Sequence, residues 1–222
     1  MLQNMKWSWI IALFTLIAGL VAYVQLPADA IIPLHWDIDG NVDRSTASHS
    51  AFFLIPAIQV FIIVLFAIVL AIDPRQENVR KSIPAIRVMM TSAIILLAVV
   101  QLIIISSSFN MNIIGMEALM AAMGVLFMIL GNYMSKLRSS FFFGIRTPWT
   151  LSSDYVWKKT HRLAGRLFLL AGLIIFVMSF LVTIKIISFI IIGAILPAAI
   201  IPVIYSWVIW RDENKEKNQQ QP

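Results

Sequence analysis

Long apolar runs, separated by short polar breaks, make up most of the chain from residue 7 to residue 210. Each run carries few or no charges and is close to or above the length of about 20 residues that a helix needs to cross a bilayer. The runs cover residues 7–26, 51–72, 85–108, 116–134, 167–183 and 186–210. This pattern predicts an all-α, polytopic membrane protein with six transmembrane helices, of which the fifth is the shortest.

The distribution of basic residues predicts the orientation. With the N-terminus inside, 15 of the 17 Lys and Arg residues are cytoplasmic, and only Arg44 and Lys185 lie outside. Because cytoplasmic loops of membrane proteins are enriched in Lys and Arg, we expect both termini in the cytoplasm. The first run is longer than a usual signal-peptide core and is followed by Pro27, so we expect it to be retained as a helix.

Composition supports the same class and removes several others. Of the 222 residues, 60% are hydrophobic and 13% are charged, whereas soluble domains have about 45–50% and about 25%. One helical bundle therefore accounts for residues 1–222 as a single membrane domain. The net charge of +6 faces the inner leaflet, where anionic lipids favour it, so we expect lipid rather than nucleic acid as its partner. The absence of cysteine excludes disulfides and thiolate chemistry.

Polar groups inside the apolar runs are few. Gln101 lies in mid-run, Glu117 at the outer end of the fourth run and Asn132 near its inner end. Such groups usually contact another helix, and no pair of acids forms an obvious proton relay, so coupled transport is poorly supported. Pro197 and Pro202 are expected to bend the last helix.

The break at residues 27–50 is predicted to be an extracellular acidic loop. It contains His35, Trp36, Asp37, Asp39 and Asp43, and Asp39-Gly40-Asn41 is a turn signal. Carboxylates and histidines on one loop raise a metal hypothesis, but their spacing matches no defined calcium loop or zinc motif. We therefore expect a folded cap with solvated acids and no metal.

Residues 131–168 are predicted to form a cytoplasmic loop followed by an amphipathic helix. Gly144, followed by Thr147-Pro148, indicates a tight turn at the membrane surface. Ser152 or Ser153 is a candidate cap for the helix. Leu151, Tyr155, Leu163 and Leu167 would share its apolar side, and Lys158, Lys159 and Arg162 would lie largely elsewhere. This pattern is typical of a helix on the inner leaflet.

Two residues of this segment raise sharper hypotheses. Arg146 is surrounded by aromatic residues, where an unpartnered charge is costly, so it would pair with a buried acid or bind a ligand. His161 is interpreted as a surface histidine. A membrane enzyme using Arg146, Asp154 and His161 would need a close carboxylate–histidine pair.

Two sequence blocks resemble the family of SdpI-like membrane proteins. The outer block LPADAIIPLHWDIDGNVDRSTAS carries the Leu-Pro, Ile-Pro-x-His-Trp and Gly-x-x-Asp elements. The inner block carries Gly-Asn-Tyr-Met, Gly-Ile-Arg-Thr-Pro-Trp-Thr and Trp-x-Lys-Thr-His-Arg. The inner elements fall on Asn132, Gly144, Arg146, Thr147, Pro148, Trp149, Thr150, Trp157, His161 and Arg162, and the outer elements on Pro33, His35, Trp36, Gly40 and Asp43.

The resemblance implies a non-enzymatic, multi-pass protein of the bacterial cell membrane that needs no cofactor. Such a protein confers resistance to a secreted antimicrobial peptide toxin on the outer face. The resemblance further implies toxin sensing and capture of a cytoplasmic transcriptional repressor. A transporter or channel, and after it an inner-leaflet enzyme, are the alternatives.

Overall fold

A computed structural model describes residues 5–27, 29–111 and 115–219. Within these residues six helices are long and apolar enough to span a membrane, as the sequence predicts. The helices are α1 (Lys6–Gln25), α2 (Leu54–Ile72), α3 (Gln76–Ser108), α4 (Met116–Met134), the short α5 (Pro148–Ser152), α6 (Asp154–Met178) and α7 (Ile184–Gln219). The loop between α1 and α2 adds strands β1 (Ile32–Trp36) and β2 (Val42–Thr46) and a 3₁₀ helix, η2 (His49–Phe53).

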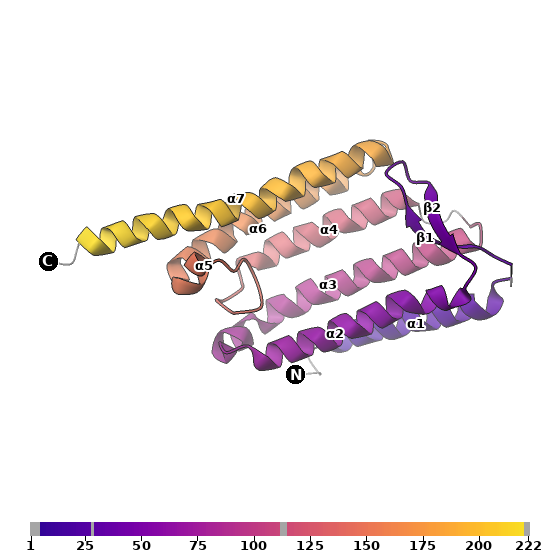
Figure 1. Ribbon diagram of the computed structural model, residues 1–222, viewed down its shortest axis with the longest axis horizontal. Helices are drawn as coiled ribbons and strands as arrows, with labels where there is room; N and C mark the ends of the chain where they lie inside the picture. Colours follow the sequence, from indigo (N-terminus) through magenta and orange to yellow (C-terminus); the bar gives the residue numbers. More distant parts are fainter. Residues whose placement is uncertain (1–4, 28, 112–114, 220–222) are drawn as a thin grey trace.

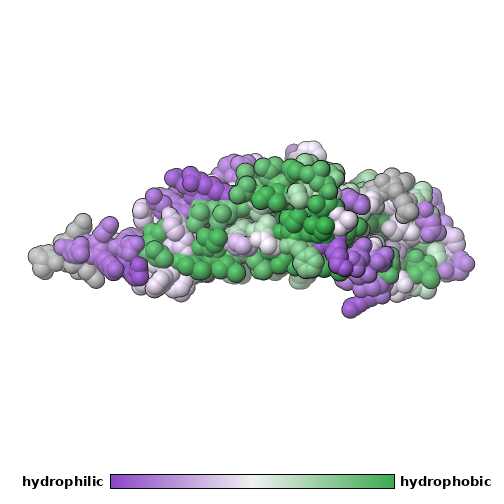
Figure 2. Space-filling view, turned by 90° about the horizontal axis from the view of Figure 1, so that it is seen from above, coloured by the Kyte–Doolittle hydropathy of each residue, from purple (hydrophilic) through white to green (hydrophobic). Residues whose placement is uncertain are grey.

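The spanning helices lie roughly parallel or antiparallel in one elongated bundle (Figure 1). α4 packs against α3 and α6, α6 packs against α7, and α1 and α2 pack against each other and against α3. The β1–β2 hairpin caps one end, whereas α5 and the loop before it lie at the other, where α1 begins and α7 ends. Apolar side chains form a broad band around the middle of the molecule, and hydrophilic side chains gather toward both ends (Figure 2). This is the arrangement that a bilayer requires.

Three helix boundaries differ from those predicted. α3 begins at Gln76 and continues through Pro84, and α7 runs from Ile184 to Gln219 with Pro197 and Pro202 inside it. Proline lacks the backbone N–H that would donate within the helix. Membrane helices nevertheless tolerate it, because neighbouring helices and local adjustments satisfy the carbonyl group left free. α6 joins the predicted amphipathic segment to the fifth span without a break, and it ends at Met178.

Two pairs of glycines bring α4 and α6 into close contact. A Cβ atom at Gly131 would lie 2.6 Å from the carbonyl oxygen of Gly165, and one at Gly124 would lie 2.8 Å from that of Gly172. The glycines are seven residues apart on each helix, so they form a continuous seam along the antiparallel pair. Small residues at such seams let backbones approach and pack without side-chain interference.

Candidate functional site: the loop between α4 and α6

The loop between α4 and α6 is folded against the bundle rather than extended along its surface. His161 of α6, which is fully buried, anchors it. Its Nε2 accepts a hydrogen bond from the backbone N–H of Ile145, 2.9 Å away, and its Nδ1 lies 2.9 Å from the carbonyl oxygen of Trp157. An acceptor at Nε2 and a donor at Nδ1 require the neutral imidazole with its proton on Nδ1. The interpretation of His161 as a surface residue is therefore wrong.

Gly144 lies directly over this histidine. Its φ of +100° is a conformation that favours glycine, and a Cβ atom there would lie 2.4 Å from His161 Nε2. A side chain at residue 144 would thus displace the loop from the acceptor that holds it.

Trp157 forms the second wall of the anchor. It is 1% exposed, its ring stacks on His161 with centroids 4.0 Å apart, and its Nε1 donates to the carbonyl oxygen of Leu137 at 2.8 Å. It is a core residue. The buried face of α6 also contains Val156, Thr160 and Ala164, whereas Tyr155 is exposed.

The apolar side predicted from Leu151, Tyr155, Leu163 and Leu167 is consequently not the packed side, and Leu151 belongs to α5. The protein's own loop and α4, not lipid, cover the buried face.

A capping box shapes the return of the chain into α5. The Thr147 hydroxyl accepts from the Thr150 backbone N–H, and the Thr150 hydroxyl accepts from the Thr147 N–H. Pro148 occupies the first turn, where its missing donor costs nothing. The Thr147 hydroxyl also lies 3.2 Å from the Ser206 hydroxyl of α7. The Thr-Pro-Trp-Thr motif is therefore a helix start that is joined to α7.

The turn between α2 and α3 latches the loop from the other side. Asp73, which is 1% exposed, accepts hydrogen bonds at Oδ2 from the backbone N–H groups of Phe141 and Phe142, at 3.0 and 3.2 Å. Arg75 donates to the carbonyl oxygen of Leu151 at 2.8 Å and to the Ser139 hydroxyl. A buried acid of the kind expected as a partner for Arg146 is therefore present, but it accepts its hydrogen bonds from backbone groups.

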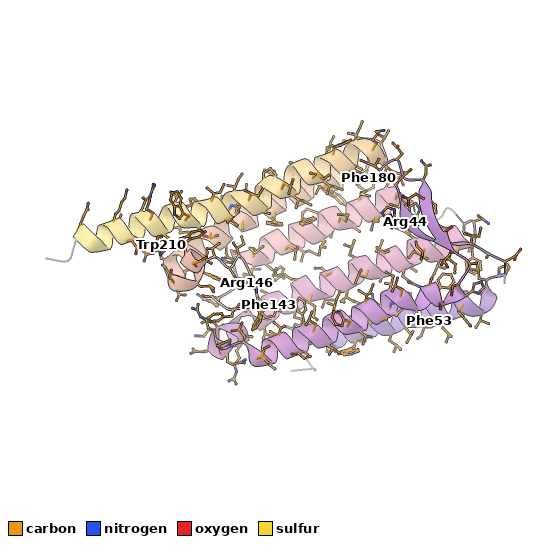
Figure 3. The ribbon with its side chains drawn as sticks, in the orientation of Figure 1. Arg44, Phe53, Phe143, Arg146, Phe180 and Trp210 are labelled. Carbon is orange, nitrogen blue, oxygen red and sulfur yellow. The ribbon has the colours of Figure 1, made fainter. Side chains whose placement is uncertain are left out.

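Arg146 is exposed. Its guanidinium donates to the carbonyl oxygen of Phe141 at 3.0 Å, and it lies near Phe143 at the end of the bundle opposite Arg44 (Figure 3). The expectation of a buried, costly charge is wrong, because the loop turns this side chain outward. Trp149, which follows Thr147 and Pro148, is half-buried. Both side chains are therefore within reach of a partner.

Asn132 and Arg162 do not join the histidine anchor. Both are exposed, and they line a separate pocket between α4 and α6. The motif therefore divides into an internal scaffold, an outward-facing arginine and tryptophan, and this pocket.

Comparisons with known proteins find the same two blocks. The model of the SdpI/YfhL protein family matches residues 136–206, and that of a domain of unknown function (DUF1648) matches residues 10–60. The immunity protein SdpI of Bacillus subtilis (strain 168) is 30% identical over 210 residues, which cover 93% of this chain and 96% of that protein. The chain belongs to the SdpI family. No solved structure matches it.

Membership in the SdpI family confirms the resemblance, and with six membrane-length helices it makes this a multi-pass protein of the bacterial cell membrane. Relationship to an immunity protein points to a role other than catalysis. The geometry around His161 agrees, because backbone groups engage both ring nitrogens. Arg146 and Asp154, both exposed, do not form a charge relay with that histidine.

At the opposite end of this SdpI-family protein, the outer-loop residues have separate local roles. His35 Nδ1 lies 2.6 Å from Asp43 Oδ1 across the hairpin, and Asp39 pairs with Lys185 of α7 at 3.2 Å. Asp37 closes the turn: the backbone N–H of Asn41 is the strongest of several donors that lower the pKa of its carboxyl. In the described residues no three acidic or histidine side chains converge as metal ligands would.

Trp36 of the same hairpin is half-buried and packs against a cluster formed by the ends of α1, α2 and α3. Gly40, at a φ of +88°, lies against Ile184. The hairpin thus rests on α7 as well as on α3.

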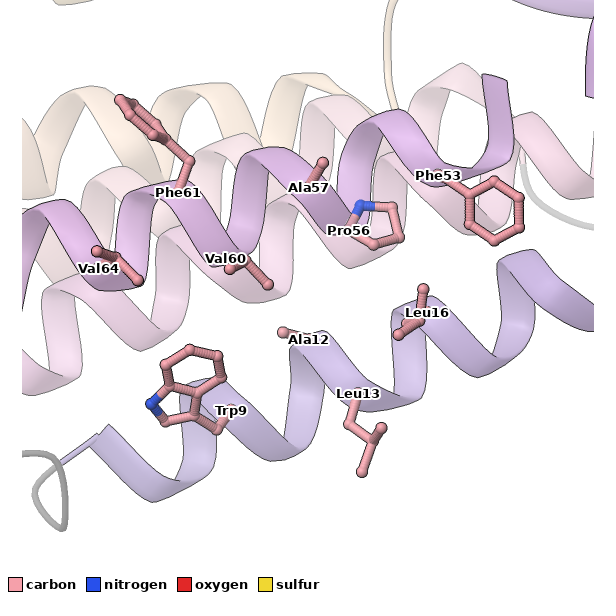
Figure 4. A pocket seen from close by; sticks show the side chains of 10 residues that line it. All are labelled: Trp9, Ala12, Leu13, Leu16, Phe53, Pro56, Ala57, Val60, Phe61 and Val64. Atoms are coloured by element: carbon pink, nitrogen blue, oxygen red, sulfur yellow. The ribbon is translucent and has the colours of Figure 1, made fainter. Parts of the chain in front are cut away.

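Buried amides within the bundle join neighbouring segments. Gln101 donates to the carbonyl oxygen of Phe52 at 3.1 Å, and Gln59 donates to that of Ile94 at 3.0 Å. A groove of about 640 Å³ between α1 and α2 is lined by apolar side chains, including those of Trp9, Ala12 and Pro56 (Figure 4). Its lining suits lipid tails rather than an ion.

Sequence reasoning missed Asp73, Arg75 and the glycine seam. Asp73-Pro74-Arg75 follows an apolar run directly, and a carboxylate at that position, flanked by a proline, was the available signal. The seven-residue spacing of Gly124 and Gly131, repeated at Gly165 and Gly172, was the signal for the seam.

Proposed function

We propose that this protein confers resistance to a secreted antimicrobial peptide toxin and that the loop between α4 and α6 is its working part. Similarity to an immunity protein over nearly the whole length of both chains carries the proposal. The buried scaffold of Gly144, Trp157 and His161 supports it, because such a scaffold presents Arg146 and Trp149 in one arrangement.

The expected orientation gives the two ends different roles. The hairpin would face the outside, where Asp29, Asp37 and Asp43 attract a cationic peptide. The loop would face the cytoplasm, where a repressor would meet Arg146 and Trp149. Toxin sensing would then require the ends to communicate, and α7 contacts both, through Lys185 at the hairpin and Ser206 at the loop.

The test is survival and membrane potential of a sensitive bacillus that expresses this chain and is challenged with the peptide toxin of the SdpI system. Wild type is compared with Arg146→Ala at equal abundance in the membrane. Arg80→Ala is the matched control, because Arg80 is an exposed arginine at the same end but outside the loop.

Protection by wild type and Arg80→Ala, with its loss in Arg146→Ala, is the expected result. If wild type does not protect, the proposed function is wrong for this toxin. If Arg146→Ala protects as well as wild type, the loop is not the working part.

A further inference from the structure

A second polar site lies beside the loop, between the end of α4 and the first half of α6. Asn132 of α4, Ser135 directly after that helix, and Arg162 and Arg166 of α6 line a pocket of about 230 Å³. The function proposed above uses neither the pocket nor Arg166.

The arginines give this pocket an unbalanced positive charge. Arg162 and Arg166 are four residues apart and therefore share one face of α6. None of the described side chains that line the pocket is acidic, and neither arginine takes part in an ion pair identified among the described residues. A neighbouring polar pocket, lined by Lys81, Arg138 and Lys158, also contains the carboxylate of Asp154, which the pocket between α4 and α6 lacks. The excess positive charge between α4 and α6 would be neutralised by a bound anion.

Glycines shape the floor of the pocket. Gly131 and Gly165 both line it, and a Cβ atom at Gly165 would lie 2.7 Å from the carbonyl oxygen of Gly131. Their lack of side chains brings the polar groups of the two helices close together and leaves space between them. Asn132 and Ser135 then supply neutral hydrogen-bonding groups opposite the two guanidinium groups.

The position of the pocket suits the headgroup level of a bilayer. Its lining ends at Leu169, whose side chain is exposed, and from Leu167 the outer surface of α6 is apolar up to Met178. A molecule bound at the arginines would therefore have apolar surface directly beside it. A phospholipid has this combination of an anionic head and apolar tails.

We propose that this pocket binds the phosphate group of an anionic phospholipid. The planar guanidinium fork matches phosphate oxygens in a bidentate manner, and basic pockets between transmembrane helices commonly hold anionic headgroups. Arg162 and Arg166 clamp the phosphate, Asn132 and Ser135 donate hydrogen bonds to the headgroup, and the acyl chains follow the surface around Leu169.

Lipid binding to the full chain, purified in detergent, tests the proposal by native mass spectrometry. The probes are phosphatidylglycerol, phosphatidylcholine and inorganic phosphate. The pocket variants are the double substitution Arg162→Gln, Arg166→Gln and the charge-preserving Asn132→Ala. Lys158→Gln, Lys159→Gln is the matched control, because it removes the same charge from the same helix outside the pocket.

Wild type is expected to retain phosphatidylglycerol in preference to phosphatidylcholine. The double arginine variant should lower the affinity for phosphatidylglycerol at least about tenfold, since each basic residue near the headgroups contributes on the order of 1 kcal/mol. Asn132→Ala should lower it about threefold, the loss expected for one neutral hydrogen bond, and the lysine control should have a smaller effect than the arginine variant.

Two results would overturn the proposal. Equal losses in the arginine and lysine variants, with none in Asn132→Ala, would mean attraction by net charge without a built site. Inorganic phosphate that binds as tightly as phosphatidylglycerol would assign the site to a soluble phosphate rather than to a lipid. The measurement of lipid and phosphate binding does not depend on toxin resistance. Its failure can therefore be told apart from a failure of the proposed function.

Discussion

Gly144 and His161 depend on each other for their positions. The imidazole of His161 is buried. It is neutral because one ring nitrogen accepts a hydrogen bond from the Ile145 N–H while the other donates to the Trp157 carbonyl. The loop reaches that acceptor only because residue 144 has no side chain and a φ of +100°. These residues of the inner motif therefore fix the path of the backbone; they are not a set of reactive groups.

Gly144→Ala is expected to lower the free energy of unfolding by roughly 2–4 kcal/mol, because it adds backbone strain to a clash with His161. Thermal unfolding of the purified protein in detergent measures the effect. Gly193→Ala is the matched control, since a Cβ atom there meets nothing within 4 Å, and its melting temperature should be that of wild type or slightly higher. Equal melting of the two variants would show that the loop does not pack on the histidine as described.

Between elements, the turn before α3 and the loop after α4 form one unit. Asp73 and Arg75 bind backbone groups of the loop and of α5, although the two segments are more than 60 residues apart. Asp73 is buried and its carboxylate accepts from backbone N–H groups, an arrangement in which the charge strengthens each bond. Breaking this latch is expected to free the loop without unfolding the bundle.

Asp73→Asn replaces the charge with a group of the same shape and turns at least one acceptor into a donor that faces backbone N–H groups. The cost of about 1–3 kcal/mol should appear as faster tryptic cleavage at Lys136, Arg138 or Arg146, with the melting of the bundle little changed. Glu77→Gln is the control, because Glu77 is an exposed carboxylate near the same turn and pairs with Lys81. Wild-type cleavage rates in Asp73→Asn would argue against the latch.

The glycine seam connects α4 to α6 by contact of backbones. Gly172→Leu should separate the helices, since a Cβ atom there would already lie 2.5 Å from the Met128 backbone nitrogen. We expect a loss of folding stability of at least about 3 kcal/mol, the upper range for overpacking, measured by denaturant unfolding in mixed micelles. Gly193→Leu, on the open face of α7, should be nearly neutral. If Gly172→Leu left the folding stability unchanged, the seam would not be closely packed.

The molecule as a whole has two hydrophilic ends joined by an apolar band (Figure 2). One end carries the hairpin with its acids and the other carries the loop and most of the basic residues. The enrichment of Lys and Arg in cytoplasmic loops predicts that the loop end faces the cytoplasm. The termini would then be cytoplasmic, as the distribution of 15 of the 17 basic residues also predicts.

Because the chain contains no cysteine, single cysteines report this orientation without background. Ser45→Cys on β2 should react with a membrane-impermeant maleimide on intact cells. Ser152→Cys in α5 should react only after permeabilisation, since both residues are exposed but lie at opposite ends. If only Ser152→Cys were labelled on intact cells, the predicted orientation would be wrong and the loop end would face the outside.

The sequence by itself determined the membrane class, the number of spanning helices and the family. These depend on run length, hydropathy and short motifs, which are local properties of the chain. It did not determine which side of α6 is buried, because the covering surface is the protein's own loop together with α4. Nor did it predict that Asp73 holds that loop, because the partner lies more than 60 residues away. Only the tertiary structure brings such groups together. There, hydrogen bonds to the backbone satisfy the buried polar groups of Asp73, Trp157 and His161, whereas the path of the loop turns Arg146 outward.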